Sequence, residues 1–374
     1  MTRGRVLSAM TPIRPSGGAV PRTVLWYTPV PNVAGVGRHL LDVAGAGIPG
    51  FRVVFAVPEG PLAEALRESG AAVVTGSFGV ADGARSAVRE LRALMRRLRP
   101  AVLHTHLAFG DLVGMLAVVR MRGADGRRVR LVSTEHGIAG DSTLYQAHRA
   151  IAALKLQIHS LRLRRTDRVI AVSASTKRQV LRQWGRGAGI SVIRNGVDPV
   201  DAAPPRSGLR VLSLARLSHE KRIDALLEGF ALVVREHPEA RLSVAGEGPL
   251  RAELEARARA LGIEDAVAFV GFVDGAEAMR THDVVAQLSA WENLSYTLLD
   301  AVAHGRGVVA SDVGGNREIV PARCLVDPDD PAAVAAAVIE QGQDLAERPT
   351  PARGSVSVGQ MCERIAGAYE EVLA

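Results

Sequence analysis

Residues 210–236 read RVLSLARLSHEKRIDALLEGFALVVRE. The segment begins with a short apolar run, Arg210–Ala215, continues through a basic loop, and ends in an amphipathic stretch, Ile223–Glu236. A short run rich in Val and Leu predicts a buried strand, and apolar residues at helical spacing predict a helix that covers it. A strand followed directly by a helix is the repeating unit of a parallel α/β sheet, so this segment predicts the fold class.

The same alternation extends in both directions from this unit. Towards the C-terminus, further strands are expected at Ala240–Ala245, Ala266–Val270, Val284–Gln287, Gly307–Ala310 and Cys324–Val326. Towards the N-terminus, strands are expected at Thr23–Thr28, Phe51–Val57, Ala71–Thr75, Ala101–His104, Leu131–Thr134, Val169–Val172 and Ser191–Ile193. Helical patterns occupy Ala84–Leu98, Ala174–Trp184, Leu250–Leu261, Ser295–Ala303, Pro331–Gln341 and Val358–Leu373. Two doubly wound, Rossmann-like domains that face a central cleft are therefore predicted.

The boundary between the domains is expected where this pattern lapses, in the Pro-rich stretch around Asp198–Arg210. A chain of 374 residues is also too long for one ordinary hydrophobic core. We expect a loose extension over residues 1–22, an N-terminal domain over 23–198 and a C-terminal domain over 199–354. The closing helix within 355–374 is expected to pack back on the first domain.

Charge is divided unevenly along the chain. Residues 1–200 hold 29 Lys+Arg and 12 Asp+Glu, whereas residues 201–374 hold 17 and 27. A basic half predicts an anionic partner, and no recognisable nucleic-acid motif or aromatic interleaving points to nucleic acid. The basic stretches Arg85–Arg99 and Lys155–Arg168 are either solvated helix faces or a docking surface for an anionic membrane or acceptor.

Cysteine usage predicts a reducing compartment. The two cysteines, Cys324 and Cys362, form neither a disulfide framework nor a metal cluster by their spacing. We therefore expect a cytoplasmic protein without a bound metal, with peripheral contact at the inner face of the membrane as an option for the basic half.

Two cations in the loop after the first strand of the second domain are candidates for anion binding. Arg216 and Lys221 stand five positions apart, where parallel sheets bind ligands at the carboxyl ends of their strands. Arg offers a fork that matches phosphate oxygens, and Lys offers a mobile point charge. The alternative is a solvated basic loop.

Turns at other strand ends are also candidates for binding. Gly246 begins a tight turn into a helix, and the backbone around Phe272 could lie against a flat base. Gly314-Gly315 lies between a strand and a helix start, where backbone N–H groups can face an anion. Two acids, Glu292 and Asp300, are eight residues apart and so share one helix face, with Glu292 expected to cap the helix entrance.

In order and spacing these motifs resemble glycosyltransferase family 4, a family of retaining enzymes with the GT-B fold. The resemblance covers most of the chain and begins with the motifs quoted above, Arg216 with Lys221, Glu292-x7-Asp300, and Gly314-Gly315 with Glu318. It also includes Gly35-Val36-Gly37-Arg38, Thr134-Glu135-His136-Gly137, Ala171-Val172-Ser173, Asn195-Gly196-Val197-Asp198 and Gly246-Glu247-Gly248-Pro249.

The resemblance implies a role for each matching residue. Arg216 and Lys221 would hold the donor diphosphate, Glu292 would contact the donor sugar, and Asp300 would stand at the acid that bonds the ribose. The remaining implied contacts are the backbone at Leu294 and Ser295 around the diphosphate, a phosphate-covering loop with Gly35 and Gly37, and His136 beside the reacting sugar.

Two positions depart from the family pattern. Asp300 is one methylene shorter than the usual Glu, so its ribose contact could run through water or a shifted helix. Ala215 replaces a common Gly before Arg216, which is inexpensive if its backbone is extended.

Other kinds of site are less well supported. A nicotinamide fingerprint at Gly35-Val36-Gly37 lacks its third glycine, because Leu40 stands there. Asp327-Pro328-Asp329 spells a metal-diphosphate motif, but Asp329 or Asp330 is more simply a helix N-cap. The histidines lack zinc-ligand spacing, and no nucleophile elbow is present.

The sequence therefore predicts a retaining, metal-independent glycosyltransferase that uses a nucleotide-diphosphate sugar and a hydroxyl acceptor of a glycan, a lipid-linked saccharide or a natural product. Two alternatives remain open at this point. One is a sugar-nucleotide epimerase on the same fold, and the other is a donor-binding module without turnover.

Overall fold

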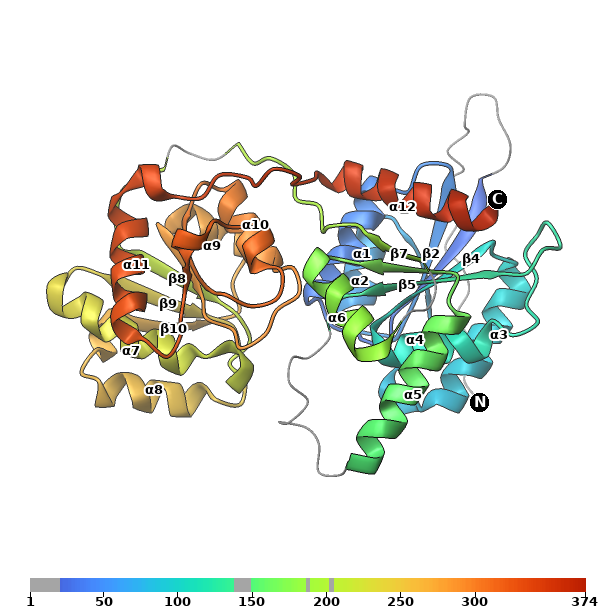
Figure 1. Cartoon of the computed structure of the whole chain (residues 1–374), viewed down its shortest axis with the longest axis horizontal. Coiled ribbons are helices and arrows are strands. Elements are labelled where there is room, and N and C mark those ends of the chain that lie inside the picture. The colour runs from blue at the N-terminus through green and yellow to red at the C-terminus, as the bar shows by residue number, and fades with distance from the viewer. Residues whose placement is uncertain (1–20, 138–148, 186–188, 202–204) are drawn as a thin grey trace.

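The computed structural model describes residues 21–137, 149–185, 189–201 and 205–374. These residues form two α/β bodies, each built on one parallel sheet (Figure 1). The predicted fold class is confirmed. The extension expected at residues 1–22 lies outside the described residues except for its last two, and Arg22 already begins a strand.

The N-terminal sheet has seven strands in the order β3-β2-β1-β4-β5-β6-β7. Their bounds are β1 (Arg22–Tyr27), β2 (Phe51–Val57), β3 (Ala72–Thr75), β4 (Val102–His106), β5 (Arg130–Glu135), β6 (Arg168–Ala171) and β7 (Gly189–Val192). Alternate residues of β1 enter two different cores, with Val24 and Trp26 on one face and Leu25 and Tyr27 on the other. The strand is thus buried on both faces, as its continuous apolar sequence predicts.

Helices cover both faces of this sheet. One core contains residues of α1 (Gly35–Ala46), α2 (Pro61–Glu68) and α12 (Val358–Leu373). The opposite core contains residues of α3 (Ala84–Leu98) and α4 (Leu107–Ala117). Near β6 and β7, α5 (Arg149–Arg165) and α6 (Ala174–Trp184) form a smaller cluster.

The C-terminal helix α12 lies against the N-terminal domain rather than the domain that precedes it in sequence (Figure 1). Tyr369 anchors it, because its hydroxyl accepts from Trp26 Nε1 at 2.9 Å and bonds His104 Nδ1 at 2.5 Å. A capping box formed by Ser357 and Gln360 begins the helix. The chain therefore crosses between the two bodies twice.

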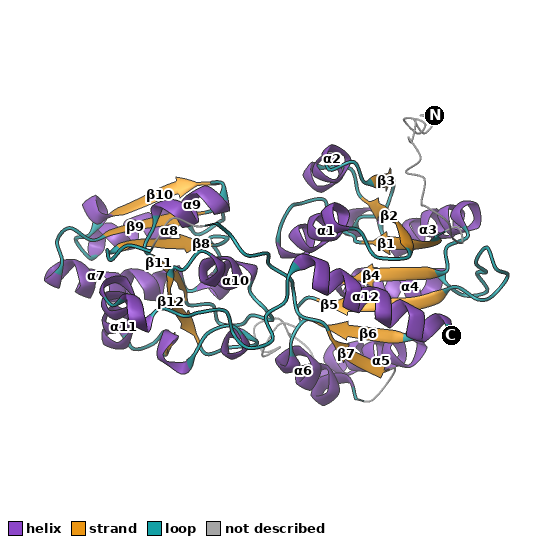
Figure 2. Ribbon diagram, turned by 90° about the horizontal axis from the view of Figure 1, so that it is seen from above, coloured by secondary structure: helices purple, strands orange, loops and turns teal. Residues whose placement is uncertain are grey.

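The C-terminal sheet has six strands in the order β10-β9-β8-β11-β12-β13. Their bounds are β8 (Arg210–Leu214), β9 (Arg241–Ala245), β10 (Val267–Gly271), β11 (Val284–Gln287), β12 (Gly307–Ser311) and β13 (Leu325–Val326). One core includes α7 (Ile223–Glu236), α8 (Arg251–Ala260) and α11 (Pro331–Gln343), and the other includes α9 (Gly275–Thr281) and α10 (Tyr296–Ala303). Figure 2 shows α10 on the side of this domain that faces the N-terminal domain.

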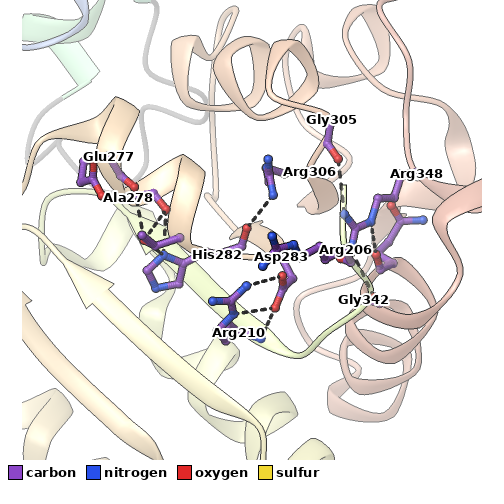
Figure 3. A network of polar contacts seen from close by, with 12 residues as sticks. Arg206, Arg210, Glu277, Ala278, His282, Asp283, Gly305, Arg306, Gly342 and Arg348 are labelled. Atoms are coloured by element: carbon purple, nitrogen blue, oxygen red, sulfur yellow. Dashed lines mark hydrogen bonds and ion pairs between the residues drawn. The ribbon is translucent and has the colours of Figure 1, made fainter. Parts of the chain in front are cut away.

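A buried acid ties together the strand beginnings of the C-terminal sheet (Figure 3). The Asp283 carboxylate accepts from the Arg210 backbone N, Nε and Nη2 at 3.1, 3.0 and 2.9 Å. Arg306 donates to the His282 carbonyl at 3.2 Å, and Arg348 donates to the Arg206 carbonyl at 2.9 Å. These contacts lie at the end of the sheet opposite the strand carboxyl ends, so we assign them to stability.

The basic helix expected at Lys155–Arg168 is wrong at its end, and one of its arginines, Arg162, is not solvated. Helix α5 ends at Arg165, and Arg168 begins β6. Arg162 is buried rather than solvated, because it pairs with Asp111 and, at 2.6 Å, with Glu135. Among the described residues, no helix combines the length and apolar character needed to cross a bilayer.

Candidate functional site

Lys221 and Glu292 meet at the carboxyl ends of β8 and β11. Lys221 ends a short helical turn, His219–Lys221, and Glu292 lies in the loop between β11 and α10. The Lys221 ammonium pairs directly with a Glu292 oxygen, which also accepts from Ser289 Oγ at 2.9 Å. The two side chains are only 22% and 15% exposed. Two residues 71 positions apart in sequence thus form one half-buried, charged pair.

Arg216 lies in the same loop as Lys221 but points its charge to solvent. Its side chain is 68% exposed, and it forms an ion pair with Glu220 at 2.7 Å. Ser218 Oγ donates to the same Glu220 oxygen at 2.7 Å. Exposed pairs of this kind contribute little to stability, so Arg216 can turn towards a ligand at small cost.

Glycine turns hold this loop system in place. Gly246 has φ 132°, and a Cβ there would lie 2.0 Å from the Ala215 carbonyl oxygen. A Cβ at Gly314 would lie 1.7 Å from the Glu292 carbonyl oxygen, and one at Gly315 would lie 2.1 Å from that of Asn293. The Gly-Gly turn therefore packs directly on the backbone that carries Glu292, which only glycine permits.

The start of α10 differs from the prediction in one respect. Ser295, not Glu292, is the N-cap, because its Oγ accepts from Leu298 N at 3.3 Å. Ser295 Oγ in turn donates to Gln287 at 2.7 Å. The Leu294 carbonyl accepts from Asn195 Nδ2 of the N-terminal domain at 3.1 Å. Glu292 is free of the capping role and faces Lys221 instead.

Asp300 lies on α10, where it faces α1 of the N-terminal domain. Its carboxylate pairs with Arg38 at 3.3 Å, and Arg38 also binds Asp42 at 2.8 Å. The guanidinium lies over the Tyr296 ring, 5.3 Å from its centroid. Burial raises the pKa of Asp300, and the positive charge of Arg38 opposes that rise. The acid that the family pattern assigns to ribose thus has a partner from the other domain.

The predicted glycine loop at Gly35 and Gly37 is wrong. Both residues lie in the first turn of helix α1, and their helix buries Leu40 and Val43 in the core. A Cβ at Gly37 would lie 2.9 Å from the Asn32 carbonyl oxygen, so this glycine allows close backbone packing. The helix has no side-chain N-cap. Its first-turn N–H groups are the donors that this segment can offer.

His136 belongs to a cluster of four histidines, three of which contact the Trp26 ring. Its Nε2 bonds His106 Nδ1 at 2.9 Å, and its ring lies 4.8 Å from that of His39. His39 also bonds the Tyr296 hydroxyl across the domains at 3.2 Å. Burial lowers the pKa of His39 to about 4, and it lowers the pKa values of His104 and His136 well below the usual value. These rings are therefore neutral at pH 7.

Phe272 follows β10 and is 87% exposed. It comes directly after Gly271, whose φ of 71° turns the chain at the strand end. The ring is therefore accessible at the carboxyl end of the strand, and its contact with a flat base stays a prediction.

A cavity of about 530 Å³ opens at the carboxyl ends of β11, β12 and β13. Ser289, which donates to Glu292, lies in its wall together with Arg222 and Arg317. Asp329 pairs with Arg222 at 2.6 Å, and Asp330 caps α11 by accepting from Ala332 N and Ala333 N, as predicted. Within the described ranges, no group of three or more His, Cys, Asp or Glu residues is arranged to hold a metal ion.

Comparison with known families assigns both halves of the chain. Residues 33–201 match the family described as Glycosyltransferase Family 4, and residues 208–344 match Glycosyl transferases group 1. The chain belongs to glycosyltransferase family 4, of the group 1 enzymes. The predicted family is confirmed.

Curated relatives of this family 4 chain include two kinds of transferase. Glycogen synthase of Mycobacterium tuberculosis is 32% identical over 276 residues, which cover 70% of this chain and 64% of the relative. One component of the phosphatidylinositol N-acetylglucosaminyltransferase of Arabidopsis thaliana is 28% identical, over 64% of this chain and 54% of the relative. The chain thus spans less than two thirds of the length of either protein.

Solved structures share the fold. Anabaena Alr3699/HepE in complex with UDP and glucose has a TM-score of 0.73 at 19% identity, covering 94% of this chain and 97% of that one. Sucrose-phosphate synthase from Thermosynechococcus elongatus has a TM-score of 0.69 at 20% identity, covering 94% of this chain and 96% of that one.

Three contacts of the family 4 chain were not foreseen from its sequence. Glu318 accepts from Ala174 N and Ser175 N at the start of α6, at 3.1 and 2.9 Å, and pairs with Arg194 at 3.1 Å. The other two are Arg38 with Asp300 and His39 with Tyr296. All three join the domains, and no local pattern reveals such long-range partners.

Proposed function

We propose that this chain transfers a sugar from a nucleotide-diphosphate sugar to a hydroxyl acceptor, with retention of anomeric configuration. The observation that carries the proposal is the Lys221–Glu292 pair beside Arg216 at the strand carboxyl ends. One ligand that carries a diphosphate and a sugar would satisfy both members, with phosphate oxygens for the cations and sugar hydroxyls for the carboxylate.

The proposed reaction breaks the bond between the sugar C1 and the diphosphate oxygen. Arg216, Lys221 and the amides at the start of α10 would stabilise the negative charge that develops on the departing diphosphate. The acceptor oxygen would form the new bond to C1 from the same face, and its proton would pass to a diphosphate oxygen. Glu292 would hold the sugar hydroxyls, with His136 close to the reacting centre.

Contacts with the rest of the donor follow from the same placement. The Leu294–Ser295 backbone and the first turn of α1, with Gly35 and Gly37, would lie along the diphosphate. Asp300 would bind the ribose and Phe272 would lie against the base, with Gly246 shaping the turn between them. The HepE structures hold UDP or UDP-glucose, so a uridine nucleotide is the first donor to test.

The acceptor is proposed only as a class. The curated relatives are named for glycogen synthesis and for N-acetylglucosaminyl transfer to phosphatidylinositol, so both glycan and lipid-linked hydroxyls belong in a screen, together with natural products. We also propose that the protein works in the cytoplasm, with the basic faces of α3 and α5 towards an anionic membrane surface.

A donor-turnover assay tests the proposal. Purified protein is incubated with labelled nucleotide sugars, with and without acceptor mixtures, and released UDP and product anomers are measured. We expect turnover to fall about 100-fold or more in Arg216→Ala and in Lys221→Ala, because charge stabilisation of the leaving group is lost. Glu292→Gln should lower turnover while UDP still binds.

Several outcomes would contradict parts of the proposal. Full turnover in both cation variants would remove the diphosphate assignment. Loss of activity in EDTA with recovery in manganese would exclude a metal-independent reaction. An inverted product would exclude retention, and an epimerised nucleotide sugar without acceptor product would indicate an epimerase instead.

A further inference from the structure

A pocket lined by arginines lies in the N-terminal domain, at the end of its sheet where the strands begin. Its volume is about 320 Å³, and it is lined by Arg92, Arg96, Arg99, Arg120, Met121 and Arg122. The first three arginines come from the last turns of α3 and its C-cap, and the other two follow α4. Both helix ends precede the beginnings of strands, whereas Lys221 and Glu292 follow strand carboxyl ends in the other domain.

The charge in this pocket is not neutralised by the described part of the chain. No acid there forms an ion pair with any of the five arginines. Asp125, the acid nearest to Arg122 in sequence, accepts from Arg127 N at 2.9 Å. Like charges held together without a counterion repel each other, so an anion from outside the chain would stabilise them.

Two of these arginines have a backbone conformation that favours glycine. Arg99 has φ 46° and Arg120 has φ 61°, and they are two of only four non-glycine residues with positive φ in the described ranges. Glycine is the usual residue at such helix-terminal positions because it carries no Cβ. Local backbone preference would favour glycine at both positions, yet both hold arginine, and both side chains line the same pocket.

Helix capping accounts for only part of the cluster. Arg92 Nη1 donates to the carbonyls of Leu116, Ala117 and Val119 at 3.3–3.5 Å, so it caps α4. Arg122 donates to the Gly126 carbonyl at 2.8 Å. For Arg96, Arg99 and Arg120, the described residues provide no side-chain hydrogen bond of this kind. Their three guanidinium groups are free to bind a ligand.

We infer that this pocket binds a phosphate-bearing anion. Several guanidinium forks around one open cavity match the oxygens of a phosphate or diphosphate group. The ligand could reach the pocket as a soluble phosphate compound or as the headgroup of an anionic lipid. Leu116 and Val119 beside the pocket are 48% and 44% exposed, which is the apolar neighbour that a bilayer surface would cover. The site shares no residue with the Lys221–Glu292 site and does not depend on sugar transfer.

Binding of two probes tests the inference. The full chain is titrated with inorganic pyrophosphate by calorimetry, with saturating UDP present so that the cleft does not contribute. In parallel, it is sedimented with phosphatidylcholine vesicles with or without phosphatidylglycerol. The variant is Arg99→Gly with Arg120→Gly, and the control is Arg85→Ala with Arg89→Ala, which removes the same charge from exposed positions earlier on α3.

We expect the glycine variant to lose at least about tenfold in affinity for the probe that binds, while its Tm stays equal or rises because glycine suits both backbone positions. The control should keep its affinity within about threefold, the size of a small general charge effect. Binding of pyrophosphate identifies a soluble ligand, and binding only to phosphatidylglycerol vesicles identifies a lipid headgroup. Equal losses in both variants, or no binding of either probe to the natural protein, would overturn the inference.

Discussion

Arg38 and Asp300 form an ion pair that joins the first helix of the N-terminal domain to α10 of the C-terminal domain, at 3.3 Å. Asp42 and the Tyr296 ring contact the same guanidinium. The family pattern has Glu at the position of Asp300. In this chain the shorter Asp300 side chain contacts Arg38. The ribose position of the proposed donor site is therefore coupled to the contact between the domains.

A double-mutant cycle on this pair tests the coupling. We expect Arg38→Ala and Asp300→Asn each to weaken UDP binding by about two- to fivefold, the range of a partly exposed ion pair. Because both variants break the same interaction, the double variant should be no weaker than the weaker single variant. Calorimetric titration with UDP measures all four affinities.

The matched control is Arg52→Ala, since Arg52 is an exposed arginine of the same domain that bonds Thr23. Its UDP affinity should equal that of the natural protein. Losses that add in the Arg38 and Asp300 double variant would mean that the two residues act independently on the nucleotide.

The buried histidines predict a loss of stability in mild acid. The pKa of folded His39 is lowered to about 4 by burial, whereas the unfolded side chain titrates near 6.5. As pH falls from 6.5 to 4, His39 becomes protonated in the unfolded chain but stays neutral in the folded protein. The free energy of unfolding therefore decreases over this window, and His39 does not change it at higher pH. His39→Phe keeps a ring on Trp26, which His39 stacks at 5.6 Å, and removes the titration.

Urea unfolding at several pH values measures this effect. Between pH 8 and pH 4, the free energy of unfolding of His39→Phe should fall by about 3 kcal/mol less than that of the natural protein. Each unit of pKa shift corresponds to about 1.4 kcal/mol. Burial raises the pKa values of Asp42 and Asp300, which acts in the opposite direction, so only the difference between the two proteins isolates His39. Parallel curves would show that His39 is not kept neutral by the fold.

Sequence periodicity was sufficient for the strands and for most long helices, because burial on both faces leaves continuous apolar runs. Helices α3, α6, α7 and α12 have the predicted bounds. Helix α1 was missed because three of its twelve residues are glycines, which lower helix propensity. Its burial against the sheet supplies the stability that the local sequence lacks.

In the candidate site, too, local motifs predicted some of the residues, whereas others depend on partners that are distant in the sequence. Strand-end placement brought Lys221 and Glu292 to one edge of the sheet, as their motifs indicated. The partners of Asp300, His39 and Arg162 come from segments tens to hundreds of residues away, and only the folded chain places them together. A basic stretch could not reveal that Arg162 is buried between two acids.

The network around Asp283 predicts a strong stability effect at the end of the C-terminal sheet opposite Lys221 and Glu292. Asp283→Asn leaves all three Arg210 donors without a charged acceptor, in a site where the Asp283 side chain is 2% exposed. We expect a loss of about 2 kcal/mol in the free energy of unfolding, since half of the Arg210 side chain still reaches water. Urea unfolding of the C-terminal domain, followed by circular dichroism, measures it.

The control for this variant is Asp329→Asn, because Asp329 pairs with Arg222 and its side chain is 75% exposed. Its effect should stay below about 0.5 kcal/mol. Similar losses in both variants would show that burial of Asp283 does not set the strength of its interaction.

Glu318 predicts how the second contact between the domains responds to loss of one charge. Its two oxygens accept from the first N–H groups of α6 and from Arg194. Glu318→Gln keeps one acceptor oxygen and loses the charge, so the start of α6 should open more often. Hydrogen exchange at Ala174 and Ser175 should quicken about tenfold, as expected for about 1.4 kcal/mol from charge-assisted bonds. UDP affinity should stay nearly unchanged, because these amides lie on the N-terminal domain and not beside Lys221; unchanged exchange would mean that Glu318 does not hold α6.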